Sequence, residues 1–137
     1  KLLEKDVTEL KEWLLKLPET YSPLGLDVTC CHGSPWDVMD GYVYPDSPIE
    51  EFLRYSPGCF FLGHTHYPMK RSIKEKYIVN PGSLGQARNR GWPTYAVVDY
   101  YSKKVSFKEV VYDKSVLLKQ IDEAGDSKRY LRKILEE

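Results

Sequence analysis

Histidine and cysteine are scarce in this chain, which has three of each among its 137 residues. An odd number of cysteines, two of them adjacent, excludes a regular disulfide framework and favours a reducing compartment, which we take to be the cytoplasm. No apolar run is long enough to cross a bilayer, and the start of the chain is too charged for a signal peptide. The 20 basic and 20 acidic residues cancel, so the net charge indicates no strong affinity for nucleic acid or an anionic membrane.

The first half of the chain mixes helical and strand patterns. Apolar residues recur at helical spacing over residues 2–17, and Pro18 ends this predicted helix. The short apolar runs 26–31 and 59–62 predict two buried strands. Residues 40–48, rich in Gly, Pro, Asp and Ser, predict a long surface loop between them.

A short helix is predicted over residues 49–55, directly after this loop. Pro48 suits its first turn, and either Asp46 or Ser47 is placed to cap its N-terminus.

The second half predicts antiparallel strands followed by helices. The predicted strands span residues 69–73, 76–80, 93–100 and 104–112, the first two joined at Lys74 and Glu75. The predicted helices span residues 116–124 and 128–137, with a break near Gly125. No repeat or linker divides residues 1–137, so we expect one α/β layered domain with a mixed sheet and flanking helices.

All three histidines follow short apolar runs. His32 follows one predicted strand, and His64 and His66 follow the other in the stretch FFLGHTHYPMK. Ligands of α/β sheets bind outside the carboxyl ends of strands, and residues i and i+2 of an extended chain point the same way. We therefore expect the three imidazoles to converge at one rim, with Gly63 allowing a sharp turn close to a ligand. Because neutral imidazole binds Zn, Mn, Fe and Ni, the pattern indicates a metal site.

Two other interpretations remain open. A single histidine at a strand end is often structural or exposed to solvent. Alternatively, Cys59, His64 and His66, with Cys30 or Cys31, would make a structural zinc site. The spacing lacks the usual CxxC pair, and the cysteines lie in apolar runs where a thiol packs as a small core residue. We therefore expect the three thiols to be reduced and free of metal.

Three segments carry a family resemblance. CHGSPWD, FFLGHTHYP and IVNPGSLGQARNRGWPTYAVVD, in this order and spacing, resemble the calcineurin-like metallophosphoesterase superfamily, and most closely its compact bacterial and archaeal phosphodiesterase branch. GHTH followed by NPGS is specific for this family, and the flanking segments are similar as well. The resemblance implies the C-terminal half of a four-layer α/β/β/α sandwich.

The resemblance also implies a site and an activity. In this family two divalent metals, Mn being the one we expect and Fe, Ni or Zn the alternatives, are bridged by an aspartate. The resemblance implies that His32 and His64 bind one metal and that His66 binds the other. It implies a phosphoesterase that hydrolyses a phosphodiester or a phosphomonoester. Residues 64–92, with six Lys/Arg and one acid, suit the phosphate-ester substrate, and we expect the turn that begins at Asn80 to shape the backbone beside the histidines.

The family motifs Asp-x-His, Gly-Asp and Gly-Asn-His-Asp or -Glu do not occur in this chain. Lys1, which is not a Met, stands roughly where the family continues after the last of them. We therefore expect residues 1–137 to be the C-terminal portion of a single domain, with the N-terminal half truncated or on a separate chain. Three imidazoles without a bridging carboxylate do not neutralise the repulsion between two close dications. Alone, the chain should be nearly inactive.

Two consequences follow from the missing motifs. We expect the chain either to need its N-terminal half as a partner or to self-associate through uncovered apolar surface. The alternative function is a catalytically inactive metal-binding or regulatory module of the same fold, and a structural zinc domain ranks third.

Overall fold

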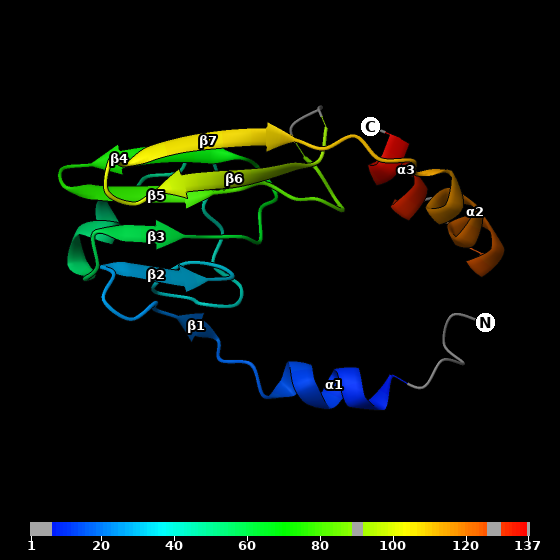
Figure 1. The fold of residues 1–137 in the computed structure, drawn as a ribbon, viewed down its shortest axis with the longest axis horizontal. Helices are drawn as coiled ribbons and strands as arrows, with labels where there is room; N and C mark the ends of the chain where they lie inside the picture. Colours follow the sequence, from blue (N-terminus) through cyan, green and yellow to red (C-terminus); the bar gives the residue numbers. More distant parts are fainter. Residues whose placement is uncertain (1–6, 89–91, 126–129, 137) are drawn as a thin grey trace.

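The computed structural model describes residues 7–88, 92–125 and 130–136. Its strands form a five-stranded sheet in the order β1-β2-β3-β5-β4 and a two-stranded sheet of β6 and β7 (Figure 1). The elements are α1 (Thr8–Leu15), β1 (Thr20–Tyr21), β2 (Val28–Cys31), η2 (Glu50–Arg54), β3 (Cys59–Phe61), β4 (Met69–Ile73), β5 (Lys76–Asn80), β6 (Thr94–Asp99), β7 (Lys104–Glu109), α2 (Ser115–Ala124) and α3 (Tyr130–Glu136).

The larger sheet is mixed, which confirms the predicted fold class of a mixed sheet with flanking helices. Strands β2, β3 and β5 run parallel, with Thr29 opposite Phe60 and Phe60 opposite Ile78. Strand β4 leads into β5 through the predicted turn at Lys74 and Glu75, and the two strands pair antiparallel. Because parallel strands end at the same edge, the loops that follow β2 and β3 leave the sheet side by side.

The core lies on the face of this sheet covered by η2 and the loop before it. Phe52 of η2 and Phe60 of β3 are fully buried, and their ring centroids lie 5.0 Å apart in an edge-to-face arrangement. Ile78 of β5 is also fully buried, and Val43 and Ile49 join the same cluster. Packing of this kind is the main stabilisation of a domain of this size.

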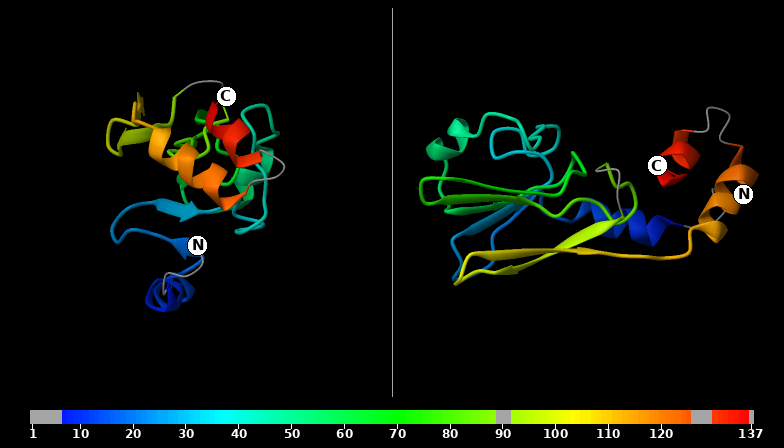
Figure 2. Two further views of the ribbon diagram at one scale, coloured as in Figure 1. Left: turned by 90° about the vertical axis from the view of Figure 1, so that its right-hand side faces the viewer. Right: turned by 90° about the horizontal axis from the view of Figure 1, so that it is seen from above.

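The β6–β7 hairpin lies against the opposite face, so the central parallel strands are covered on both sides (Figures 1 and 2). Cys59 and Tyr77 of the large sheet face Val98 and Val105 of the hairpin across a small apolar cavity. The hydroxyl of Tyr100 accepts a hydrogen bond of 3.0 Å from the backbone N–H of Asp27, directly before β2. This arrangement explains why β3 and β5 are apolar on both faces.

The three helices lie outside the two sheets. Helix α1 buries none of its residues, although its apolar side chains recur at helical spacing. Helices α2 and α3 pack on each other through buried Ile121 and Leu135, and Arg132 forms an ion pair of 2.6 Å with Asp122. Gly125 ends α2 with φ of 74°, which confirms the predicted break. Within the described part of the chain, no helix is long and apolar enough to cross a membrane.

Two local details differ from the sequence-based predictions. The two-residue strand β1, which pairs antiparallel with β2, was not predicted, because two exposed residues give no periodicity. The predicted cap of the short helix was wrong: η2 is capped by Ile49 without a side-chain hydrogen bond, so neither Asp46 nor Ser47 has that role. The hydroxyl of Ser47 instead accepts a hydrogen bond of 2.9 Å from the backbone N–H of Tyr44 and closes the loop.

Candidate metal centre

His32 and His64 meet at the carboxyl ends of β2 and β3. The N–H of Gly63 donates a hydrogen bond of 2.9 Å to the carbonyl of His32, extending the contact of the two strands beyond their ends. As a result, Nε2 of His32 lies 2.9 Å from Nδ1 of His64. Strands β2 and β3 are separated by a long loop in the sequence but pair in the sheet, and the histidines that follow them, His32 and His64, are in direct contact. The sequence predicted that these two histidines meet.

The spacing of these two nitrogens suits a shared cation. Two imidazole nitrogens, each 2.0–2.1 Å from one metal and at a right angle, lie about 3 Å apart. Partial desolvation lowers the pKa of His32, with His64 and His66 adding to the effect and Asp40 opposing it. The lowered pKa favours the neutral imidazole, which is the form that binds metal.

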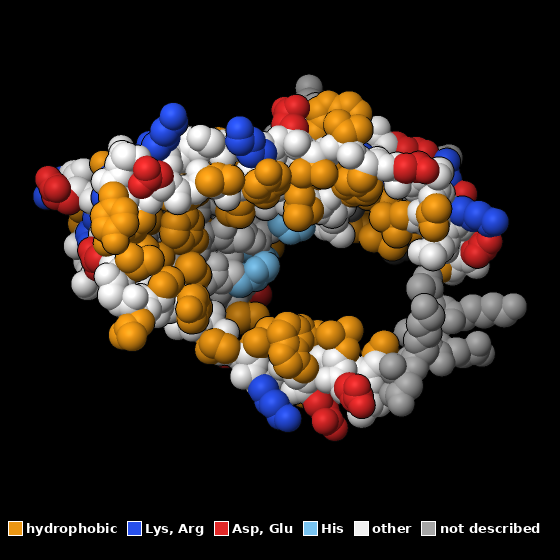
Figure 3. All heavy atoms as spheres, in the orientation of Figure 1, with side chains coloured by type: hydrophobic (Ala, Val, Ile, Leu, Met, Phe, Trp, Pro, Cys, Tyr) orange, Lys and Arg blue, Asp and Glu red, His pale blue; other side chains and the backbone are white. Residues whose placement is uncertain are grey.

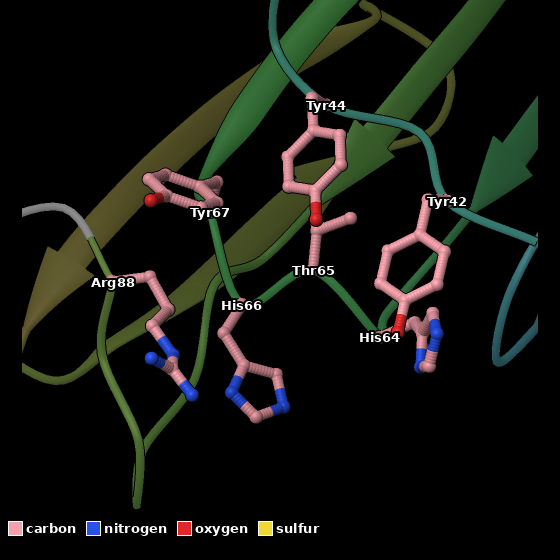
Figure 4. A pocket seen from close by; sticks show the side chains of 7 residues that line it. All are labelled: Tyr42, Tyr44, His64, Thr65, His66, Tyr67 and Arg88. Carbon is pink, nitrogen blue, oxygen red and sulfur yellow. The ribbon is translucent and has the colours of Figure 1, made fainter. Parts of the chain in front are cut away.

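His66 lines a cavity together with His64, but its imidazole is oriented by a different part of the chain. Its Nδ1 donates a hydrogen bond of 3.0 Å to the backbone carbonyl of Gln86. This bond places the proton on Nδ1 and leaves the lone pair of Nε2 free, the usual arrangement for a metal-binding histidine. Figure 4 shows the His66 ring directed into the cavity, beside Arg88 and apart from the His64 ring.

The backbone of this loop differs from the extended chain that the sequence argument assumed. His64 and His66 have φ of 60° and 62°, in the left-handed region that few residues other than glycine adopt. The expectation for Gly63 was also wrong, because the left-handed turns fall on the two histidines and not on this glycine. Strained backbone of this kind is concentrated at functional sites.

The side chain of Asn80 fixes the histidine loop through hydrogen bonds. This side chain is fully buried, and its Nδ2 donates to the carbonyl of Gly63 and, over 3.1 Å, to the hydroxyl of Thr65. Its Oδ1 accepts a hydrogen bond of 3.0 Å from the N–H of Gly82. The segment beginning at Asn80 therefore shapes the backbone beside the histidines, as predicted.

The next residues connect this turn to His66. Gly82 has φ of 86°, and a Cβ there would lie 2.1 Å from Oγ1 of Thr94, so a side chain does not fit. Ser83 accepts a hydrogen bond of 2.9 Å on its hydroxyl from the N–H of Gln86. Because the carbonyl of Gln86 accepts from His66, the turn sets the orientation of that imidazole.

A cavity of about 330 Å³ opens beside the histidine loop (Figure 4). Its lining residues are Tyr42, Tyr44, His64, Thr65, His66, Tyr67 and Arg88. Arg88 also donates a hydrogen bond of 3.3 Å to the hydroxyl of Tyr130 in α3. An arginine within reach of two imidazoles is suited to bind an anion such as a phosphate.

Arg88 is the residue of the basic segment 64–92 that lines this cavity. The side chains of Lys70, Arg71 and Lys76 instead donate to backbone carbonyl groups around the β4–β5 hairpin. Arg90 lies outside the described residues. Among the described Lys and Arg residues of this basic segment, Arg88 is therefore the one whose side chain lines the cavity.

The cysteines do not form a metal-ligand group with the histidines among the described residues. All three are free, and burial raises the pKa of each, that of Cys31 to about 11. Cys59 begins β3, at the end of the strand opposite the loop that carries His64. In residues 7–88, 92–125 and 130–136, no group of three or more His, Cys, Asp or Glu side chains is arranged to hold a metal ion. Among the described residues, the structure therefore does not support the structural zinc site.

The described site thus consists of histidines on loops after parallel strands, with an arginine lining the same cavity. Residues 7–103 match the calcineurin-like phosphoesterase superfamily domain, and the chain belongs to this superfamily.

Solved structures show the same fold. A metallophosphoesterase from Sphaerobacter thermophilus is 27% identical, with a TM-score of 0.77 over 86% of this chain and 58% of the other. A hypothetical protein from Pyrococcus horikoshii is 28% identical, with a TM-score of 0.72 over 85% of this chain and 49% of the other. An uncharacterised protein of Methanocaldococcus jannaschii is 27% identical over 65% of this chain and 43% of its own length. The chain thus spans about half the length of these relatives.

Sequence reasoning missed the aromatic side of the cavity. Tyr42, Tyr44 and Tyr67 lie in loops, where exposed aromatic residues have no period that would mark them. The available signal was the Tyr-Val-Tyr alternation in the loop of residues 40–48, which places two rings on one side of a buried valine.

Proposed function

We propose that this chain supplies the histidine half of a dinuclear metal site in a metal-dependent phosphoesterase. The observation that carries the proposal is the 2.9 Å separation of His32 Nε2 and His64 Nδ1, in a member of this superfamily. His32 and His64 would hold one divalent cation, and Nε2 of His66 would bind the second. Mn²⁺ is the metal we expect, with Fe, Ni and Zn as alternatives.

Two such cations supply an activated water and neutralise the charge on the phosphoryl oxygens of an in-line displacement. Arg88 binds a non-bridging oxygen of the phosphoester and orients it toward the histidine loop. Asn80 keeps that loop in place, so the imidazoles need no rearrangement when the substrate binds. The substrate is a phosphodiester or a phosphomonoester.

The second half of the site would come from the N-terminal half of the domain, whether in the same polypeptide or in a separate chain. The exposed apolar surface supports this partner. Figure 3 shows apolar side chains on α1 and on the body of the protein facing a hollow between them. Helix α1 buries no residue of its own, so its apolar stripe is available to pack against the missing segment. Without that segment, the same surface favours self-association.

We expect this chain alone to be nearly inactive. Its three histidines lack a carboxylate to bridge two dications, and such charges repel strongly at short range. The test compares the chain alone with the chain mixed with an N-terminal half carrying Asp-x-His, Gly-Asp and Gly-Asn-His-Asp. We call this mixture the assembled enzyme. Hydrolysis of bis(p-nitrophenyl) phosphate with Mn²⁺ should appear in the mixture alone and disappear on adding a chelator. Full activity of the isolated chain as a monomer would refute the proposal.

The absence of a three-ligand group among the described residues favours a second function, an inactive metal-binding or regulatory module. Such a module would bind Mn²⁺ in the assembled state without hydrolysing phosphoesters. Calorimetric titration with Mn²⁺, run beside the hydrolysis assay, separates the two functions. A cytoplasmic location remains part of the proposal in either case, since it rests on the three reduced thiols.

A further inference from the structure

We propose that Tyr42 and Tyr44 form an aromatic wall that selects phosphoesters carrying a planar aromatic group of nucleobase size. This inference rests on the proposed phosphoesterase function and names the substrate class of the same site. It assigns a binding role to one side of the cavity, opposite the arginine.

The two rings are nearly parallel and stacked. Their centroids lie 5.8 Å apart, and their planes differ by 12°. The Tyr42 ring also lies 4.2 Å from the His64 ring, and Tyr44 lies 5.9 Å from Tyr67. Figure 4 shows the Tyr42 and Tyr44 rings side by side, with their hydroxyl groups directed toward the histidine loop. A base placed on this surface would keep its phosphate close to the imidazoles.

The wall is fixed to the histidine loop by the backbone between the rings. Val43 is buried in the core, so the residues on either side of it both turn outward. The carbonyl of Val43 accepts a hydrogen bond of 3.5 Å from the hydroxyl of Thr65, the residue between the two loop histidines. Gly41 holds the start of the segment, because a Cβ there would lie 2.2 Å from the Ser34 hydroxyl. The distance between the rings and the metal centre is therefore set by the fold.

The exposure of these rings argues for a ligand. Tyr42 is 59% exposed and Tyr44 39% exposed, so neither ring is needed to fill the core. The rings line a cavity of about 330 Å³, close to the lower size of small-molecule sites, and present exposed aromatic surface to a planar group. Arg88 lines the same cavity and binds the phosphate end of such a ligand. Stacking is tolerant of sequence because every base has a π-face, so the wall selects aromaticity and not a particular base.

The test compares two phosphomonoesters that differ by a base, adenosine 5′-monophosphate and ribose 5-phosphate. Both are used as competitive inhibitors of the assembled enzyme, so the comparison measures binding and does not depend on the reactivity of a leaving group. We expect the nucleotide to inhibit about tenfold more strongly, within the range of base–aromatic stacking. The paired variant Tyr42→Leu/Tyr44→Leu should remove this preference, and Tyr42→Phe, which keeps the ring, should retain it. Tyr101→Leu, at a tyrosine that is 88% exposed and outside the cavity, is the matched control.

Binding of the same two compounds by calorimetry gives a readout that does not need turnover. If the assembled enzyme hydrolyses no phosphoester but binds the nucleotide more tightly through the two tyrosines, the proposed function fails and the aromatic wall stands. If hydrolysis is present and the two compounds inhibit equally, the wall is refuted. It is also refuted if the preference survives in a folded double variant. If the double variant does not fold, the single variant Tyr42→Leu is compared with Tyr42→Phe. Loss of the nucleotide preference in Tyr42→Leu alone supports the wall, and its survival in both variants refutes it.

Discussion

The side-chain amide of Asn80 donates a hydrogen bond to the hydroxyl of Thr65, the residue between His64 and His66. The same amide also holds the carbonyl of Gly63, so one buried side chain fixes the loop on both sides of the first histidine. The strained backbone at the histidines is therefore maintained by a group that itself does not face the cavity. Asn80 is a positioning residue for the histidine loop and, through it, for the proposed metal centre.

Replacing Asn80 with alanine should weaken both the fold and the site. The substitution leaves the carbonyl of Gly63 and the hydroxyl of Thr65 buried without this partner, at a cost of about 1–3 kcal/mol in the free energy of unfolding. Chemical denaturation measures that cost, and Mn²⁺ titration of the assembled enzyme should show a lower affinity. Gln120→Ala, which removes an exposed amide on α2, is the control. Unchanged metal affinity in Asn80→Ala would contradict the positioning role.

Replacing His66 with alanine should cut turnover of the assembled enzyme severely and leave its assembly intact. The imidazole lies in a loop, so it contributes little to the core, whereas its free Nε2 is a proposed metal ligand. Turnover is measured with Mn²⁺, and assembly is followed by size-exclusion chromatography. A variant that keeps most of its turnover would show that His66 binds no metal.

Replacing Arg88 with alanine should raise KM for a phosphoester substrate by about tenfold, because a charge-assisted hydrogen bond to the phosphate is lost. Arg88→Lys should recover part of the loss, since lysine keeps the charge but not the planar fork. Arg54→Ala is the matched control, because that guanidinium pairs with Glu51 on the surface of η2. Equal KM values for the Arg88 and Arg54 variants would place the phosphate elsewhere.

The three thiols should react slowly with iodoacetamide in the folded chain. Burial raises the pKa of Cys31 from 9.0 to about 11, so near pH 8 its thiolate fraction falls by about a hundredfold. The shifts of Cys30 and Cys59 have the same direction. Mass spectrometry should find one alkylated cysteine or none after brief native labelling and three in denaturant without reductant. Finding a single reactive thiol in denaturant would reveal a disulfide.

Placing a charge on α1 should reduce self-association of the isolated chain. Leu14 is 51% exposed on the apolar side of this helix, and Leu14→Glu would make the surface unsuitable for another apolar face. Sedimentation velocity measures the association, and the same variant should assemble less well with the N-terminal half. Tyr101→Glu, in the turn after β6, is the control. If Leu14→Glu changes neither process, α1 is not part of the docking surface.

Sequence patterns predicted the central elements because their physical causes are local. Strand β3 is a short and mostly buried apolar run, β2 is a mainly apolar run of which Val28 is buried and the rest half-buried, and the β4–β5 hairpin has a clear break between its strands. The convergence of His32 and His64 followed from the pairing of these two strands. The predicted pairing of these two strands therefore placed His32 and His64 at the same edge of the sheet.

The remaining details depend on contacts that a linear pattern does not contain. The left-handed backbone of His64 and His66 is maintained by Asn80, which is distant in the sequence. Either Asp46 or Ser47 was expected to cap a helix, but neither does, and the hydroxyl of Ser47 closes the preceding loop on Tyr44. The aromatic wall depends on the burial of one valine between two exposed rings, which tertiary packing decides.

The left-handed backbone at His64 and His66 limits which residues can replace the two histidines in the proposed metal centre. Among residues with side chains, Asn and Asp enter this conformation most readily, and both offer oxygen ligands. Hard cations such as Mg²⁺ and Ca²⁺ prefer oxygen donors. An exchange of imidazole for carboxylate at these two positions therefore adds little strain to the loop, whereas a β-branched residue would add much more. The backbone conformation would thus permit a change of the proposed centre from transition-metal to alkaline-earth ligands.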